Sequence, residues 1–225
     1  MKEHKLKLSI LVAGICAQAA AFGVIELNPI LDSDVYHGTD APTGSTETLG
    51  VSWDVESPEG SAFYHGQQSL VQFDVSGVTD PITSATLYLY VSPFTSPYAS
   101  FGVGNVSVFE QTSAWDLSPG SLTWDDFSAG TDLGDISVTQ ESVWVTLDVT
   151  TIVQGWANNT VDNYGFLLTP EGTLSTQFAS METGSTAPIL AINGAATVPE
   201  PASYAAMFGA MALCFVATRR RSQRA

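Results

Sequence analysis

Short segments that alternate apolar and polar residues recur along the central part of this chain, and they constrain its fold more than any other feature. Val71, Phe73 and Val75 fall on one side of such a segment, with Gln72 and Asp74 on the other. Further segments of this kind, or shorter runs, are 85–91, 103–109, 143–149, 164–168, 176–182 and 188–193. A period of two is typical of strands with one buried face.

Clusters of Gly, Pro, Ser, Asp and Asn separate these segments and predict turns. The clusters lie at 76–81, 92–104, 116–121, 128–135 and 169–175. Only 150–157 has apolar residues at helical spacing. We therefore predict an all-β fold, an antiparallel β-sandwich or jelly roll, in one domain at 22–197 that includes an extended lead-in and a linker.

Lysine and arginine are absent between residues 8 and 218, so all seven lie at the two ends of the chain. Residues 24–198 contain 13 Asp and 8 Glu. This excess of negative charge excludes nucleic acid as a partner and predicts a saline or calcium-containing setting, because the acids repel one another. Both cysteines, Cys16 and Cys214, lie outside this region, so we expect a hydrophobic core rather than disulfides to stabilise it.

The first 21 residues have the three parts of a secretory signal peptide. Lys2, Lys5 and Lys7 precede an apolar run at 8–17, and small alanines follow at 19–21. This order predicts export through the Sec machinery and removal of residues 1–21 by signal peptidase.

An uncharged and mostly apolar stretch at 202–218 lies near the other end of the chain. Its length is at the lower edge of what a transmembrane helix needs. Arg219, Arg220 and Arg221 follow it at once, and arginines next to a membrane helix favour the cytoplasmic side. We expect a C-terminal transmembrane helix with its tail inside the cell.

The tetrapeptide Val198-Pro199-Glu200-Pro201 precedes this stretch. Together with the apolar span and the arginine cluster, it resembles the PEP-CTERM sorting signal of Gram-negative bacteria, here at 198–225. The resemblance implies that an exosortase processes the protein after transient anchoring in the inner membrane. It also implies residence at the cell surface or in the extracellular matrix, in association with extracellular polysaccharide.

Several motifs follow one another in order between residues 30 and 194. They are 69–75, 82–89, 108–109, 115, 122–124, 145–150, 153–156, 164–168, 178–182 and 187–190. Their progression resembles the DNRLRE domain, a β-jelly-roll module of exported surface proteins. Some members are carbohydrate-binding modules attached to polysaccharide lyases, so the resemblance implies glycan binding. The family commonly has an arginine just before its Phe-Asp strand, whereas this chain has Ser69 and Gln72, so a ligand contact by that arginine is absent.

Exposed aromatic side chains are the groups on which a glycan would stack. Trp53, Tyr64, Tyr98 and Phe101 lie in segments flanked by Gly, Pro and Ser, and we take them as candidate ligand-binding residues. Anchoring of loops explains the same four residues equally well. The tryptophans at core-type positions of the family are expected to be buried: Trp115, Trp124, Trp144 and Trp156.

Two pairs of acids, Asp32 with Asp34 and Asp125 with Asp126, lie in segments expected to be loops. Hard oxygen ligands on flexible backbone suit calcium, the one cofactor that we expect, and solvated turn aspartates are the alternative. His37 and His65 both occur in a Tyr-His-Gly tripeptide. A shared metal or a pair of turn residues would explain these histidines.

The central region lacks the residue patterns of a catalytic site. It has no Cys, Lys or Arg, and the chain has no G-x-S-x-G or H-E-x-x-H motif. We therefore expect no enzyme but a surface or extracellular-matrix protein, sorted by an exosortase and associated with polysaccharide. Two alternatives stay open, namely a carbohydrate-binding module with a defined glycan and a polysaccharide-active enzyme that uses a carboxylate pair.

Overall fold

The computed structural model describes residues 23–37, 48–56, 63–94, 101–117, 122–124 and 127–194. These residues contain 11 antiparallel strands. The strands are β1 (Ile25–Leu27), β2 (Pro29–Tyr36), β3 (Thr48–Glu56), β4 (Phe63–Phe73), β5 (Ala85–Val91), β6 (Gly104–Gln111), β7 (Ala129–Val138), β8 (Val143–Asp148), β9 (Phe166–Glu171), β10 (Leu174–Ala179) and β11 (Ile189–Ile192). Helix α1 (Thr150–Ala157) follows β8, and the 3-10 helix η3 (Met181–Thr186) follows β10.

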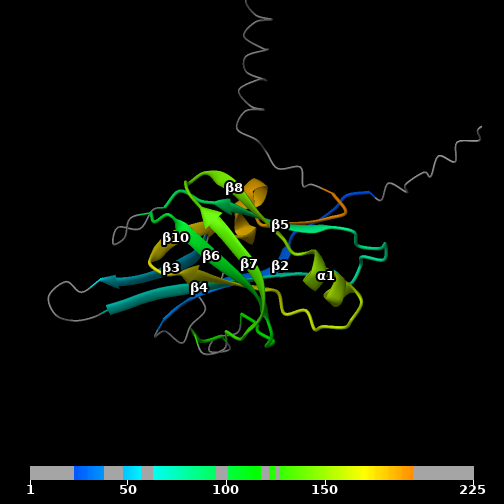
Figure 1. Ribbon diagram of the computed structural model, residues 1–225, viewed down its shortest axis with the longest axis horizontal. Coiled ribbons are helices and arrows are strands. Elements are labelled where there is room, and N and C mark those ends of the chain that lie inside the picture. The colour runs from blue at the N-terminus through cyan, green and yellow to red at the C-terminus, as the bar shows by residue number, and fades with distance from the viewer. Residues whose placement is uncertain are drawn as a thin grey trace, which may run out of the picture.

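The strands pair in the order β1-β11-β5-β10-β3-β4-β9-β6-β7, with β2 beside β4 and β8 beside β5. This hydrogen-bonded set folds over so that β5, β8, β10 and β11 face β6, β7 and β9 (Figure 1). Strands β3 and β4 connect the two layers, because β3 pairs with β10 on one side and with β4 on the other. The predicted antiparallel β-sandwich is confirmed.

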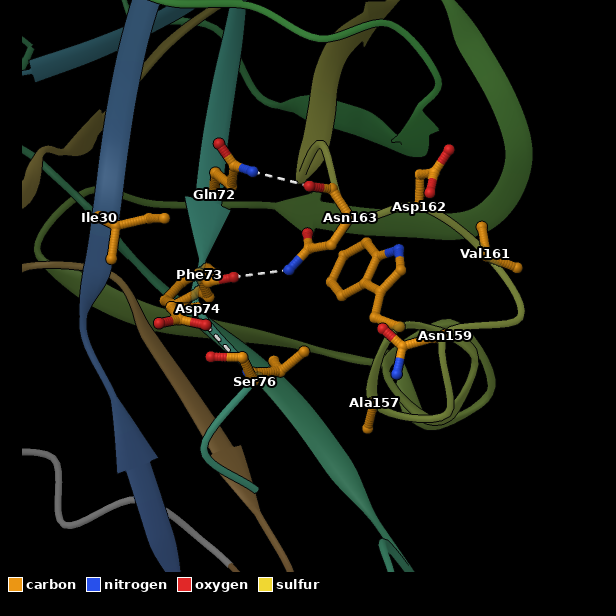
Figure 2. A pocket seen from close by; sticks show the side chains of 12 residues that line it. Ile30, Gln72, Phe73, Asp74, Ser76, Ala157, Asn159, Val161, Asp162 and Asn163 are labelled. Atoms are coloured by element: carbon orange, nitrogen blue, oxygen red, sulfur yellow. Dashed lines mark hydrogen bonds between the residues drawn. The ribbon is translucent and has the colours of Figure 1, made fainter. Parts of the chain in front are cut away.

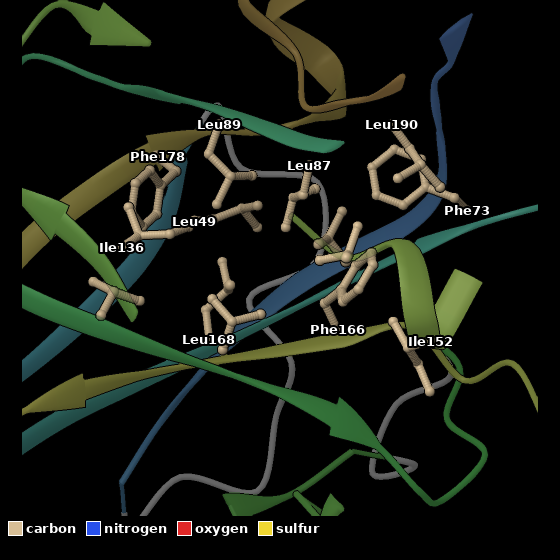
Figure 3. Packing of buried hydrophobic residues seen from close by; sticks show 14 of the residues in the cluster. Leu49, Phe73, Leu87, Leu89, Ile136, Ile152, Phe166, Leu168, Phe178 and Leu190 are labelled. Atoms are coloured by element: carbon tan, nitrogen blue, oxygen red, sulfur yellow. The ribbon is translucent and has the colours of Figure 1, made fainter. Parts of the chain in front are cut away.

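The main core lies between the two layers and is built from the apolar faces of the alternating segments. Leu87 and Leu89 of β5 point toward Leu168 of β9, and none of the three has exposed surface (Figure 3). Phe166 contacts Phe73 with ring centroids 6.2 Å apart. Burial of such side chains stabilises a domain by roughly 1.5–3 kcal/mol for each large residue, which suits a region without disulfides.

A second, smaller core covers the outer side of the neighbouring strands β2, β4 and β9. Val35, Leu70 and Leu167 contribute the strand side chains, and Trp115 and Leu122 pack on them from the segment between β6 and β7. The Trp115 indole also donates a hydrogen bond of 2.8 Å to the carbonyl of Tyr164. This segment is therefore attached to the sheet and can present side chains in fixed positions.

The structure confirms some predicted elements and corrects others. Strand β5 has the predicted bounds 85–91, and the helical turn at 150–157 is α1. The turn predicted at 128–135 is wrong, because 129–138 form strand β7 beside β6. The loop predicted around Asp32 and Asp34 is also wrong, because both lie in β2, which pairs with β4 along its length. Within the described residues no helix is long and apolar enough to cross a membrane, and 202–218 lies outside them.

Candidate functional site

Three aromatic rings from different parts of the chain meet near the end of β2. His37 directly follows β2, Trp53 lies in β3, and Trp124 lies in the segment between β6 and β7. The His37 ring centroid is 5.1 Å from that of Trp124 and 6.0 Å from that of Trp53. The two indoles are 6.2 Å apart. We call the surface formed by His37, Trp53 and Trp124 the aromatic surface.

Gly66 of β4 allows the two indoles to approach the sheet this closely. It lies opposite Trp53 in the β3–β4 pair, and a Cβ atom at position 66 would be 2.9 Å from the Trp53 ring and 3.0 Å from the Trp124 ring. The Gly66 carbonyl also accepts a hydrogen bond of 2.8 Å from the His37 amide. The glycine therefore holds all three members of the aromatic surface next to one stretch of backbone.

The aromatic surface is anchored to the second core but is not part of it. Phe127 packs on that core and lies 6.1 Å from Trp124, in an edge-to-face arrangement. His37 is exposed, whereas Trp53 and Trp124 are each half-buried. Half-buried indoles with fixed positions offer ring surface to a ligand at a low cost in side-chain entropy.

A separate pocket of about 340 Å³ lies between the end of β4 and the end of α1 (Figure 2). Several of its polar groups bind one another. The Gln72 amide donates to the Asn163 carbonyl, and the Asn163 amide donates to the Phe73 carbonyl, both at 2.7 Å. The Ser76 amide donates to Asp74 at 2.9 Å. These bonds fix the loop after α1 against β4, so we assign this pocket a structural role.

The buried acids of β2 also make internal contacts. The Asp34 carboxylate accepts hydrogen bonds of 3.0 Å from the Gly50 amide and from the Gln67 side chain. Gly50 lies just before the part of β3 that pairs with β4. Asp32 accepts one of 2.6 Å from the amide of Met181. Burial raises the pKa of each acid to about 6, and for Asp32 the nearby carboxylates of Glu182 and Asp34 add to the effect of burial.

The family model of carbohydrate-binding module family 96 matches residues 24–194, which include every strand described above. The chain belongs to carbohydrate-binding module family 96. No curated protein matches the chain significantly. Family 96 comprises carbohydrate-binding, non-catalytic modules, which agrees with the expectation that the protein is not an enzyme. Membership favours the alternative of a carbohydrate-binding module over the main expectation of an exosortase-sorted surface or matrix protein that is only associated with polysaccharide.

The structure places only one of the four predicted ligand-binding residues of the family 96 module in the aromatic surface. Trp53 is part of the aromatic surface. Phe101 packs against the main core, because its segment pairs with the start of β10, where the Gly102 amide donates to Ser175. Tyr64 lies in β4 with its side chain outside the described residues, and Tyr98 lies outside them altogether.

The family resemblance placed the other four tryptophans of the family 96 module in the core, and the structure confirms this for two of them. Trp115 and Trp156 are buried as predicted, with 9% and 3% of their surface exposed. Burial of Trp124 and Trp144 was expected and is wrong, because both are half-buried on outer surfaces. Trp144 pairs with Tyr90 on the outer side of β5 and β8, at 5.4 Å between centroids. Trp124 is the ligand-binding candidate that the sequence missed, because its neighbours His37 and Trp53 are far away in the chain.

Metal binding and sorting by the family 96 module stay predictions. Among the described residues there is no group of three or more His, Cys, Asp or Glu side chains that could hold a metal ion. Asp125 and Asp126 lie outside these residues. The signal peptide and the sorting motif, 198–201 with the arginines at 219–221, also lie outside them.

Proposed function

We propose that this family 96 module is a non-catalytic carbohydrate-binding module that binds a polysaccharide through the aromatic surface. The observation that carries the proposal is the meeting of Trp53, Trp124 and His37 over Gly66. The C–H groups of a sugar ring pack on an indole face, and a polar ring beside it can hydrogen-bond to hydroxyls. His37 is suited to that hydrogen bond, because a neutral imidazole contains both a donor and an acceptor nitrogen.

The charge of the module restricts which polysaccharide it binds. Residues 24–198 offer no lysine or arginine to pair with a carboxylate or sulfate, and they contain 21 acids. A polyanionic glycan is therefore repelled unless a divalent cation such as calcium bridges it to the protein. We propose that the ligand of the aromatic surface is a glycan without carboxylate or sulfate groups.

The two ends of the chain support a proposal about where this binding takes place. The signal peptide pattern at 1–21 and the PEP-CTERM pattern at 198–225 support export, exosortase processing and residence at the cell surface or in the extracellular matrix. In that location, a polysaccharide-binding module would attach the protein to matrix polymer. A full-length, unprocessed band in a host that has an exosortase would contradict the sorting proposal.

Affinity electrophoresis of the full-length protein in gels that contain neutral or anionic polysaccharides tests the binding site. We expect retardation by at least one neutral polymer, and a loss of about tenfold or more in affinity for Trp53→Ala and Trp124→Ala, since stacking on one indole contributes on the order of 1–2 kcal/mol. Trp144→Ala is the matched control, because Trp144 is a half-buried tryptophan on the opposite layer.

Two results would overturn the proposal. One is the absence of retardation by any polysaccharide, with and without calcium. The other is an equal effect of Trp144→Ala and Trp124→Ala, which would place the site elsewhere. Far-ultraviolet circular dichroism and thermal denaturation should show that the variants keep the native fold, so that a loss of binding reports on the removed indole.

A further inference from the structure

A cleft of about 650 Å³ lies between β7 and α1, away from the aromatic surface. Strand β6 contributes Glu110 to it, β7 contributes Thr131 to Leu133, and the end of β8 contributes Asp148. Its volume is in the range of small-molecule sites. We call this space, with the carboxylates of Glu110, Asp132 and Asp148, the acidic cleft.

Glu110 is the least exposed of the three acids, with 8% of its surface accessible. Its Oε2 atom accepts hydrogen bonds from the hydroxyl and the amide of Thr131, at 2.8 and 3.3 Å. Its Oε1 atom accepts none from the described residues. The chain has no lysine or arginine between residues 8 and 218 that could pair with this carboxylate. A buried carboxylate without a counter-ion favours a positively charged ligand.

The other two acids are exposed and each keeps one oxygen available. One Asp132 oxygen accepts from the Gly134 amide and one Asp148 oxygen accepts from the Thr150 amide, both at 2.9 Å. The described residues contain no group of three acids close enough to hold one metal ion. Carboxylates that are spread around a cleft in this way fit an extended ligand with several donors better than they fit a single cation.

The remaining lining of the cleft combines hydroxyls with apolar groups. Thr151 and Thr160 offer hydroxyls, whereas Leu133, Ile152 and Val161 offer apolar surface. A sugar ring has the same mixture of hydroxyl groups and C–H faces. The cleft therefore has the chemistry of a sugar subsite with an added preference for positive charge.

We propose that the acidic cleft binds a glycan that carries protonated amino groups. An ammonium group of the sugar pairs with Glu110 Oε1, and Asp132 and Asp148 accept hydrogen bonds from neighbouring amino or hydroxyl groups. The proposal rests on the proposed role of the module in carbohydrate binding, but it uses a different site. The preference for cationic sugars follows from the charge of the cleft rather than from the aromatic rings.

Isothermal titration calorimetry of the full-length protein with a glucosamine oligosaccharide and with its N-acetylated counterpart tests the proposal. Below the pKa of the sugar amine, we expect the glucosamine oligosaccharide to bind at least about tenfold more tightly, and above that pKa we expect the difference to vanish. Glu110→Gln and Asp132→Asn should each weaken this binding about tenfold. Asp132 is exposed, so its variant remains informative if Glu110→Gln fails to fold.

Asp135→Asn is the matched control, because Asp135 is an exposed acid of β7 that bonds to Ser107 and does not line the cleft. If Asp135→Asn weakens binding as much as Asp132→Asn does, the oligosaccharide binds by diffuse attraction to an acidic surface and the proposal is overturned. Equal affinity for the N-acetylated sugar also overturns it. Trp124→Ala should leave this binding intact, so failure of the acidic cleft is distinguishable from failure of the aromatic surface.

Discussion

Trp53 of β3 lies directly opposite Gly66 of β4, and a Cβ atom on Gly66 would be 2.9 Å from the Trp53 ring. Since the same Cβ would be 3.0 Å from Trp124, one missing methyl group makes room for two indoles. The geometry of the aromatic surface therefore depends on a residue that contributes no side chain of its own.

Gly66→Ala should displace both indoles and lower stability. We expect a loss of about 1–3 kcal/mol in the free energy of unfolding, because the added methyl group overpacks a site with rigid ring neighbours. Denaturant titration followed by tryptophan fluorescence would measure both effects. Gly77→Ala is the control, because a Cβ at position 77 meets nothing within 4 Å. If the two variants are equally stable, the indoles can move aside freely.

The buried acids of β2 should make stability depend on pH. Burial raises the pKa of Asp34 from 3.8 to about 6, so the folded state retains a proton that the unfolded state releases. The contribution of Asp34 to stability is fully present below about pH 4 and is lost as pH rises through about 6. Relative to Asp34→Asn, the wild type should lose on the order of 3 kcal/mol of unfolding free energy between pH 4 and pH 7.

Asp74→Asn should reveal a dependence of stability on pH that is opposite to that of Asp34. Hydrogen bonds from Ser76 hold the pKa of the exposed Asp74 below its usual value, so its contribution is present above that value and is lost as pH falls. Chemical denaturation at several pH values would separate the two cases. A difference between wild type and Asp34→Asn that stays constant with pH would contradict the raised pKa.

Asn193 connects the end of β11 to the loop before β5. Its side chain accepts hydrogen bonds from the amide and the hydroxyl of Thr83, at 2.7 and 3.1 Å, and donates one of 3.0 Å to the Pro81 carbonyl. Its φ of 60° also lies in the left-handed region. Asn193→Ala should cost about 2–3 kcal/mol by thermal denaturation, because it removes these bonds and strains the backbone.

Asn193→Gly separates the two contributions, because glycine removes the hydrogen bonds but tolerates a positive φ. We expect a smaller loss for this variant, of about 1–2 kcal/mol. Equal melting temperatures for the alanine and glycine variants would show that the left-handed backbone carries no strain at this position.

Screening of the acidic residues should stabilise the module. With 21 acids and no lysine or arginine in residues 24–198, we expect the denaturation midpoint to rise from low salt to high sodium chloride. Calcium at matched ionic strength tests the predicted metal sites, because only a specific site raises the midpoint further. Midpoints that are the same in low salt, high sodium and calcium would contradict both the repulsion and the calcium prediction.

Strands with one apolar and one polar face could be predicted from the sequence, whereas strands rich in glycine or with buried aspartates could not. Strand β5 alternates cleanly, so its bounds were predictable. The first six residues of strand β7 include two glycines and one aspartate, so its composition indicated a turn. The strand nevertheless pairs with β6, through shifts in register. Strand β2 buries Asp32 and Asp34 against Met181 and Gly50, and no local pattern shows that such distant partners will satisfy them.

The candidate site was predictable only in part for the same reason. Trp53 was a candidate because Gly, Pro and Ser flank its segment, which is a local property. Trp124 was expected in the core because it matches a core-type position of the family that the sequence resembles. Only the packing of its segment on the sheet brings it beside His37. The contribution of Gly66 is equally non-local, since it follows from the rings that lie above it.

The pairing of β1 with β11 has a consequence for how the chain is completed. Ile25, near the start of the module, lies opposite Ile192, near its end, and the register continues to Leu27 and Leu190. Because synthesis proceeds from the N-terminus, almost every other strand has been made before this edge can close. A product truncated before residue 189 would leave β1 without its partner strand, and such an unpaired edge is open to proteases, so closure of this edge distinguishes a finished module from a truncated one.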